Sequence, residues 1–247
     1  MARPVAVGFT YAEFLLSALA FAPLIGAARL SSWSDPTHRR AGHWLRNFGK
    51  LTSALTPLWD FSVEGEPPAD IGSRAYVVVS NHESNADPFL LSWLPWDMRW
   101  ISKEELFRLP FLGALMRMGG DIALRRGDGD SVRDMFAQCR ATLERGLSVM
   151  IFPEGTRSRD GSLGAFKEGA FRLAIEAGVP VLPVALSGTR ACLPRGSGAL
   201  GEARAIARVL TPIETRGLTL SDVESLSQQA RKQIEQARDE LRTRLAQ

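Results

Sequence analysis

The chain has 247 residues, of which 45% are hydrophobic and 23% charged, and its formal net charge is +3. These values are typical of a folded protein with one sizeable core and exclude a disordered chain. Two cysteines, Cys139 and Cys192, are too few for a disulfide framework, so a reducing compartment is expected. Three histidines without H-x-x-H or C-x-x-C spacing argue against a structural metal.

The first 58 residues are predicted to form a helical module that associates with membranes. Residues 1–50 carry six Lys or Arg and two acids, whereas residues 51–100 carry two and seven, which favours contact of the first segment with anionic lipid. Between Glu13 and Arg29 lie only 15 uncharged residues, interrupted by a proline and a glycine, and a straight span needs roughly 20. We therefore expect a helix that lies on or dips into one leaflet, in preference to a true span, a signal peptide or a soluble helix.

A second helix is expected between Asp35 and Leu58. Its apolar residues recur at helical spacing: Trp44, Leu45, Phe48, Leu51, Leu55 and Leu58. Four basic residues lie elsewhere on it: Arg39, Arg40, Arg46 and Lys50. Such a helix can pack on the rest of the protein, or it can lie among lipid headgroups with its arginines on phosphates. The cytoplasmic face of the inner (plasma) membrane is the expected location.

From residue 59 onward, short apolar runs alternate with helical patterns, which indicates an α/β domain with a mixed sheet flanked by helices. Three apolar runs end in polar groups: Tyr76 to Val79 before Ser80-Asn81-His82, Ile122 to Leu124 before Arg125-Arg126, and Val149 to Phe152 before Pro153-Glu154-Gly155-Thr156-Arg157-Ser158. In open α/β sheets, ligands bind beyond the carboxyl ends of strands, so these groups are expected to share one crevice. The arginines make that crevice suitable for an anionic substrate.

His82 and Asp87 are candidates for a general base and the carboxylate that orients it. On one continuous helix, residues five apart lie about 140° from each other, so this pair can meet only if the backbone turns between them. Asp87 followed by Pro88 is typical of the cap and first residue of a helix, which leaves Glu83 to Ala86 for the turn. A carboxylate on one imidazole nitrogen leaves the other able to accept a proton. The alternative is an exposed loop histidine beside a helix-capping aspartate.

These blocks resemble those of the glycerolipid acyltransferase family, in particular the 1-acylglycerol-3-phosphate acyltransferases. Five blocks carry the resemblance: H-x-x-x-x-D at His82 to Asp87, the lysine motif at Lys103 to Leu106, an intermediate block at Gly120 to Arg126, F-P-E-G-T-R-S at Phe152 to Ser158, and V-P-V-x-P-V at Val179 to Val184. In the intermediate block, Ala123 and Arg125 replace the usual residues. The resemblance runs roughly from Trp59 to Leu210, and the predicted organisation is a membrane-associating module at 1–58 and an acyltransferase domain at 59–247.

The resemblance implies transfer of an acyl group from acyl-CoA or acyl carrier protein to the free hydroxyl of lysophosphatidic acid. No metal, further cofactor or nucleic acid is implied. His82 would be the general base and Asp87 its orienter. The other implied site residues are Lys103 and the backbone N–H around Gly155 for the oxyanion, Arg157 with Arg126 for the phosphate, Glu154 for a glycerol hydroxyl, and Thr156 in the same substrate-binding turn.

Other functions stay open at this point. Acylation of another lysolipid, such as lyso-ornithine lipid, uses the same blocks, and Ala123 with Arg125 marks a departure that can bear on the acceptor. A catalytically silent lipid-binding protein is disfavoured because His82 and Asp87 are both present. A serine hydrolase is disfavoured because no G-x-S-x-G elbow occurs.

Overall fold

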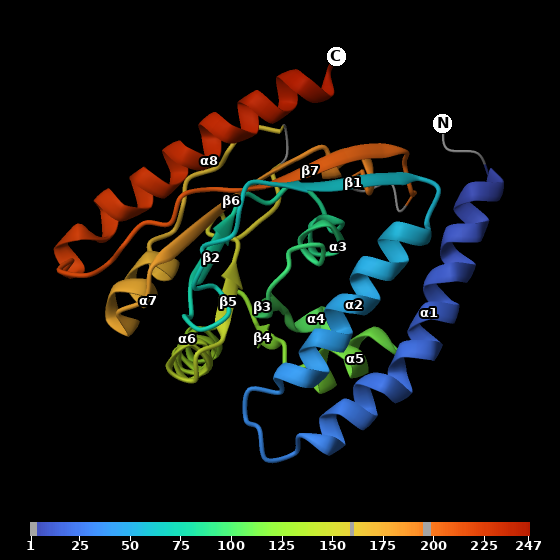
Figure 1. Ribbon diagram of the computed structural model, residues 1–247, viewed down its shortest axis with the longest axis horizontal. Helices are drawn as coiled ribbons and strands as arrows, with labels where there is room; N and C mark the ends of the chain where they lie inside the picture. The colour runs from blue at the N-terminus through green and yellow to red at the C-terminus, as the bar shows by residue number, and fades with distance from the viewer. Residues whose placement is uncertain (1–3, 159–160, 195–198) are drawn as a thin grey trace.

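Seven strands form one mixed sheet in the order β1-β7-β6-β2-β5-β3-β4 (Figure 1). The structure is a computed structural model that describes residues 4–158, 161–194 and 199–247. The strands are β1 (Trp59–Glu64), β2 (Val77–Ser80), β3 (Met98–Lys103), β4 (Ile122–Leu124), β5 (Ser148–Ile151), β6 (Val181–Ser187) and β7 (Ala203–Val209). All neighbours are parallel except β6 and β7, which are antiparallel. The predicted α/β fold with a mixed sheet is confirmed.

Helices cover both faces of this sheet (Figure 1). They are α1 (Pro4–Ser31), α2 (Arg39–Leu55), α3 (Asp87–Leu91), α4 (Glu104–Phe107), α5 (Leu112–Gly119), α6 (Gly129–Glu144), α7 (Gly169–Ala177) and α8 (Val223–Leu245). Val77 and Val79 belong to the core shared with α6, α7 and α8, whereas Val78 faces the core that includes α3. Because β2 is buried on both faces, its sequence is a continuous apolar run and does not alternate.

The N-terminal apolar tract forms one 28-residue helix, α1. The expectation that Pro23 and Gly26 interrupt it is wrong, because Phe21 and Ile25 pack with α2 and α5 in a small core that holds the helix together across the proline. α1 is long and apolar enough to cross a membrane. Core helices of soluble proteins and signal sequences meet the same criterion. Since this module shares a core with α5, the boundary at residue 58 stays a prediction.

The face that α2 buries differs from the predicted apolar stripe. Trp44, Leu51 and Leu55 are exposed, while Arg46 is only 6% exposed and donates to the Met98 carbonyl at 2.6 Å and to Asp97. Two glycines on the buried face explain the difference. A Cβ on Gly42 would lie 2.1 Å from Arg99, and one on Gly49 would lie 2.7 Å from Ser92, so α2 approaches its neighbours through small residues. Of the two alternatives for this helix, Arg46 fits packing on the rest of the protein and not contact with lipid phosphates.

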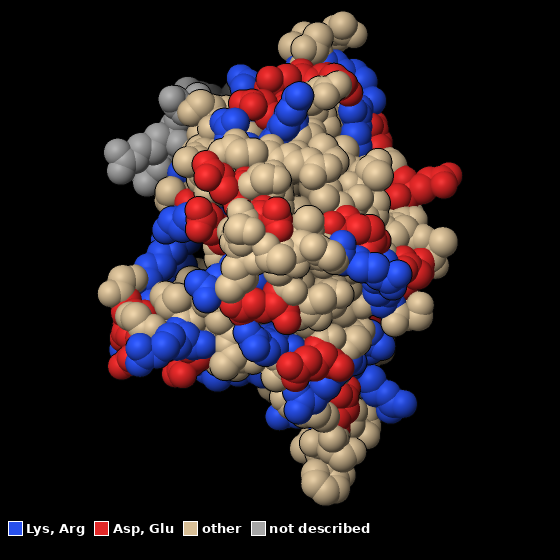
Figure 2. Space-filling model, turned by 90° about the vertical axis from the view of Figure 1, so that its left-hand side faces the viewer, with Lys and Arg blue, Asp and Glu red and all other residues tan. Residues whose placement is uncertain are grey.

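The side of the molecule that lies away from α1 is covered by interspersed basic and acidic side chains (Figure 2). On α6 and α7 several of these form ion pairs, among them Arg140 with Glu176 and Arg172 with Glu176. α1 has the opposite character, because eight of its large hydrophobic side chains are exposed: Val5, Phe9, Tyr11, Leu15, Leu16, Leu19, Leu24 and Leu30. This contrast gives the protein one charged, water-facing side and one apolar helix at the other edge.

Candidate active site

The loop after β2 brings His82 and Asp87 together, as the sequence predicts. His82 Nδ1 lies 2.7 Å from Asp87 Oδ2, and the same oxygen accepts the backbone N–H of Glu83 at 2.8 Å and of Ser84 at 3.1 Å. Asp87 is fully buried. The prediction that it caps the following helix is wrong. Asp87 is already the first residue of α3, and its carboxylate points back to N–H groups that precede the helix.

The hydrogen bond to Asp87 fixes the state of the His82 ring. A carboxylate only accepts, so Nδ1 carries the proton and Nε2 is left as an acceptor. The Phe152 ring stacks on the imidazole, with centroids 4.1 Å apart and planes 17° apart. The His82 side chain is 14% exposed, so its ring is held in one plane while solvent or a ligand can still reach it. This arrangement can accept a proton at Nε2.

The block at Phe152 to Ser158 holds the backbone of His82 from both sides. Glu154 accepts the His82 N–H at 2.7 Å, and the His82 carbonyl accepts the Ser158 N–H at 3.0 Å. The second oxygen of Glu154 accepts the Gly164 N–H at 2.9 Å, and the side chain is buried. Glu154 therefore holds two loops together, and its binding of a glycerol hydroxyl stays a prediction.

Gly155 makes the turn of this block with a positive φ of 67°, a conformation that glycine adopts most readily. Its own N–H donates to the Phe152 carbonyl at 3.0 Å. That the backbone N–H groups around Gly155 bind an oxyanion stays a prediction. The turn has a neighbour that sequence reasoning missed. A Cβ on Gly155 would lie 3.0 Å from Nζ of Lys167, so this amine lies directly over the turn. The sequence carried no signal beyond a lysine near the start of a helix.

Arg126 and Arg157 lie close enough to influence each other. Partial burial lowers the pKa of Arg126. The charge of Glu105 opposes this shift, and the charge of Arg157 adds to it. Two neighbouring guanidinium groups repel each other, so binding of a dianion to both of them is favoured. Thr156 in the same turn is exposed. Lys103 ends β3, two strands from β2, which is a separation of roughly 10 Å at the usual strand spacing.

Arg125, the residue that departs from the family pattern, has a structural role. It donates to Glu104 at 2.8 Å and to Asp128 at 3.0 Å on the surface. The hydrogen bonds and the charge of Arg125 hold the pKa of Glu104 near 2. Arg125 thus ties the start of α4 to the loop before α6.

Two more residues of the site carried no signal in the sequence. Glu83 accepts the Gly188 N–H at 3.1 Å, and burial together with the nearby Asp87 carboxylate raises the pKa of Glu83 to about 7. The Thr189 hydroxyl donates to Asp87 Oδ1. Both contacts come from the turn after β6, which is 105 positions away from Glu83 along the chain and whose role depends on the neighbouring places of β6 and β2 in the sheet.

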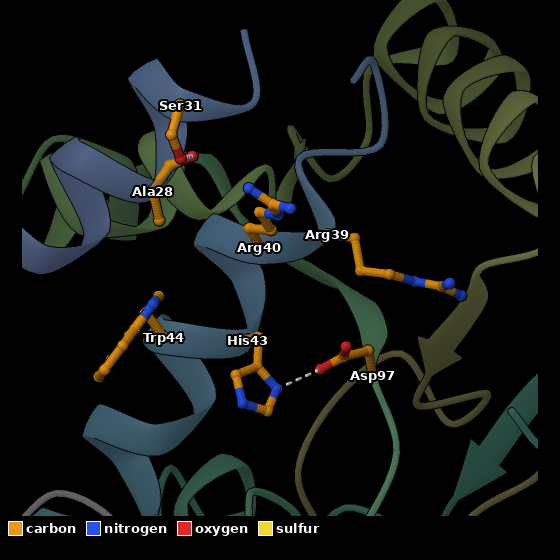
Figure 3. A pocket seen from close by; sticks show the side chains of 7 residues that line it. All are labelled: Ala28, Ser31, Arg39, Arg40, His43, Trp44 and Asp97. Atoms are coloured by element: carbon orange, nitrogen blue, oxygen red, sulfur yellow. Dashed lines mark hydrogen bonds and ion pairs between the residues drawn. The ribbon is translucent and has the colours of Figure 1, made fainter. Parts of the chain in front are cut away.

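A second histidine and aspartate pair lies at the opposite end of the sheet. Figure 3 shows His43 directed at Asp97, with Nδ1 and Oδ1 3.1 Å apart, in a hollow of about 400 Å³ between α1 and α2. Asp97 precedes β3, whereas His82 follows the parallel strand β2. Asp97 also binds Arg46, and although burial acts the other way, that charge lowers the pKa of Asp97. The two pairs differ in their place in the sheet and in burial, so pairing alone does not mark the site.

Comparison with known proteins gives consistent matches. The sequence model of the Acyltransferase family matches residues 61–187. The chloroplastic 1-acyl-sn-glycerol-3-phosphate acyltransferase LPAT1 of Arabidopsis thaliana is 39% identical over 165 residues, which are 66% of this chain and 46% of that protein. The 1-acyl-sn-glycerol-3-phosphate acyltransferase alpha of Homo sapiens is 35% identical over 161 residues, which are 64% of this chain and 57% of that protein. The chain thus spans about half the length of these relatives.

Among solved structures, the chain is similar to the 1-acyl-sn-glycerophosphate (LPA) acyltransferase PlsC from Thermotoga maritima. The two chains are 25% identical and superpose with a TM-score of 0.77, and the match covers 96% of this chain and 97% of that one. The likeness therefore includes the N-terminal helices as well as the sheet.

Proposed function

The chain belongs to the acyltransferase family, and we propose that it transfers a fatty acyl group from an acyl thioester to the free hydroxyl of 1-acylglycerol-3-phosphate, giving phosphatidic acid. The observation that carries this proposal is the His82–Asp87 pair at 2.7 Å, inside the segment that matches the family. The relatives at 39% and 35% identity are named for this reaction, which supports lysophosphatidic acid as the acceptor.

In the proposed reaction, His82 acts as the general base. Its Nε2 takes the proton of the acceptor hydroxyl as the oxygen attacks the thioester carbonyl carbon. A C–O bond forms, the C–S bond breaks, and the imidazolium returns the proton to the leaving thiolate. Asp87 holds the ring and stabilises the imidazolium. The acceptor hydroxyl is itself the nucleophile, so no covalent enzyme intermediate is required.

The oxyanion that forms at the thioester carbonyl needs hydrogen-bond donors aimed at it. Gly155 N–H is occupied within its own turn, and Lys103 lies two strands from His82. We therefore place the Lys167 amine, over the Gly155 turn, beside the Lys103 amine as a donor to the oxyanion or to the acceptor phosphate. Both positive charges favour an anionic substrate at the carboxyl ends of these strands.

The acceptor phosphate is assigned to Arg157 with Arg126. Replacement of Arg157 by lysine is expected to raise the apparent KM for lysophosphatidic acid about tenfold, because lysine keeps the charge but loses the bidentate geometry of the guanidinium. Arg157→Ala should raise it further. Steady-state kinetics with both substrates measures this, and the KM for the acyl donor should change little.

The matched control is Arg125→Lys, since Arg125 is a surface arginine bound to Glu104 and Asp128. This variant should keep the KM for both substrates. A defect of Arg157→Lys that is confined to the acyl thioester, or one of equal size with a phosphate-free lysolipid such as lyso-ornithine lipid, would remove Arg157 from phosphate binding.

We propose further that the protein works at a membrane surface, on the cytoplasmic face of the inner (plasma) membrane, because its acceptor is a lipid. α1 is the anchor, with its exposed apolar residues in one leaflet. The charged side shown in Figure 2 then faces water. The thioester donor, acyl-CoA or acyl carrier protein, approaches from that aqueous phase.

Three substitutions on α1 test the anchor without removing the packed side of the helix. Leu15, Leu16 and Leu19 are 52%, 66% and 48% exposed, so changing all three to glutamine should leave the fold intact and weaken binding to vesicles at least tenfold. Co-sedimentation with phospholipid vesicles measures the binding. Leu220→Gln is the control, since Leu220 is 50% exposed and lies outside α1. Equal binding by the triple variant and the wild-type protein would place the anchor elsewhere.

A further inference from the structure

The turn after β6, which we define as residues 188–193, is bound to the loop that carries His82 and Asp87. The Gly188 N–H donates to Glu83 Oε2 at 3.1 Å, and the Thr189 hydroxyl donates to Asp87 Oδ1. The Ser84 hydroxyl lies 3.5 Å from the Leu193 carbonyl. Two carboxylates of the catalytic loop thus accept from consecutive residues of a distant segment.

The position of this turn is fixed by its own surroundings. Gly188 has a φ of 100°, and a Cβ there would lie 2.1 Å from the Arg204 carbonyl oxygen, so the chain can turn here only with glycine. Just before the turn, the Asn81 amide donates to the Leu186 carbonyl at 2.9 Å and accepts the Leu186 N–H at 2.8 Å. The residue that precedes His82 is therefore tied to the strand that leads into the turn.

Thr189 has a particular place in the hydrogen bonds of Asp87. Oδ2 of that carboxylate accepts from His82 and from two backbone N–H groups. Among the residues that the structure describes, the donor to Oδ1 is Thr189. Both side chains are fully buried, so water does not readily replace this contact. Rotation about the Cβ–Cγ bond moves both oxygens, so the Thr189 donor at Oδ1 adds to the resistance that the three donors at Oδ2 give and helps to fix the plane of the carboxylate.

We propose that Thr189 is a positioning residue for the acyl transfer, which holds the Asp87 carboxylate in the plane that orients His82. The inference rests on the proposed function of His82 as the general base. The Thr189 hydroxyl touches neither substrate nor reacting atoms, and it acts through Asp87. Because orientation of the base matters at the transition state, loss of this hydroxyl lowers kcat and leaves ground-state binding of both substrates unchanged.

The experiment compares Thr189→Val and Thr189→Ser with the wild-type protein. Valine has nearly the shape of threonine but no hydroxyl, and serine keeps the hydroxyl. We expect Thr189→Val to lower kcat about tenfold or more, with the apparent KM for acceptor and donor within about twofold, since the lost hydrogen bond is to a buried charged group. Thr189→Ser should keep most of the wild-type kcat, because serine keeps the hydroxyl.

Thr215→Val is the matched control, because Thr215 is also a buried threonine whose hydroxyl donates at 2.9 Å, in this case to the Val179 carbonyl away from His82. It should match Thr189→Val in loss of thermal stability and keep the wild-type kcat. Equal kcat in Thr189→Val and Thr215→Val, a defect confined to KM, or no recovery with serine would overturn the proposal. The variants are compared on the lysolipid that the wild-type protein acylates. If the acceptor assignment is wrong, the wild-type protein does not acylate lysophosphatidic acid. If the role of Thr189 is wrong, the kcat of Thr189→Val does not fall.

Discussion

Replacement of His82 by alanine is expected to reduce acyl transfer by about a thousandfold, because general base catalysis typically contributes between a hundredfold and ten-thousandfold. The side chain stacks on Phe152, is only 14% exposed and contacts the buried Asp87, so its loss also costs about 1–3 kcal/mol of stability. Circular dichroism should give a wild-type spectrum, and vesicle binding through α1 should be unchanged. Steady-state rates with lysophosphatidic acid provide the measurement.

His43→Ala is a close control for this substitution. It also removes an imidazole whose Nδ1 contacts an aspartate, Asp97, but at the opposite end of the sheet (Figure 3). We expect its kcat to equal that of the wild-type protein. Loss of activity in both histidine variants would point to a general structural effect, and full activity of His82→Ala at a matched spectrum would remove His82 from the mechanism.

Replacement of Asp87 by asparagine is expected to lower kcat by about a hundredfold to ten-thousandfold with little change in lysolipid affinity. The carboxylate accepts from four donors: His82 Nδ1, the N–H groups of Glu83 and Ser84, and the Thr189 hydroxyl. Asparagine has one acceptor oxygen. Its NH₂ group must either face another donor or face His82 Nδ1, which then has to accept, so that the ring takes the tautomer with the proton on Nε2. Loss of a hydrogen bond at this buried site also costs about 1–3 kcal/mol of stability.

The result separates an orienting carboxylate from one that only holds the loop. If Asp87 only accepted the N–H groups of Glu83 and Ser84, the single oxygen of asparagine could still accept them and turnover would change little. Asp97→Asn is the matched variant, because Asp97 also binds a histidine and its loss breaks a contact with Arg46. It should lose stability and keep its turnover number. Similar turnover in the two variants would contradict the orienting role of Asp87.

The sequence allowed the sheet and the pair at its centre to be predicted because both depend on local patterns. Val77 to Val79 form a continuous apolar run, which is typical of a strand buried on both faces. In an open sheet, polar residues that follow the end of a strand indicate a site. The meeting of His82 and Asp87 required only that the backbone turn between them. These features are contained within about a dozen consecutive residues.

What could not be predicted depends on contacts between distant segments. Gly188 reaches Glu83 and Thr189 reaches Asp87 only because β6 and β2 are neighbours. The two oxygens of Glu154 accept backbone N–H groups that no spacing rule reveals. The buried face of α2 was predicted from apolar spacing, yet it is set by close approach at Gly42 and Gly49. In each case tertiary packing decided the role of a residue whose local sequence favoured another.

The most direct test of the account is the product formed by purified protein. Wild-type protein and His82→Ala, each in phospholipid vesicles, are given lysophosphatidic acid and an isotope-labelled acyl chain on coenzyme A or on acyl carrier protein, and phosphatidic acid is measured by mass spectrometry. The account predicts labelled phosphatidic acid with at least one donor from the wild-type protein, and about a thousandfold less from His82→Ala. No labelled phosphatidic acid from the wild-type protein with either donor, or equal amounts from both proteins, would contradict it.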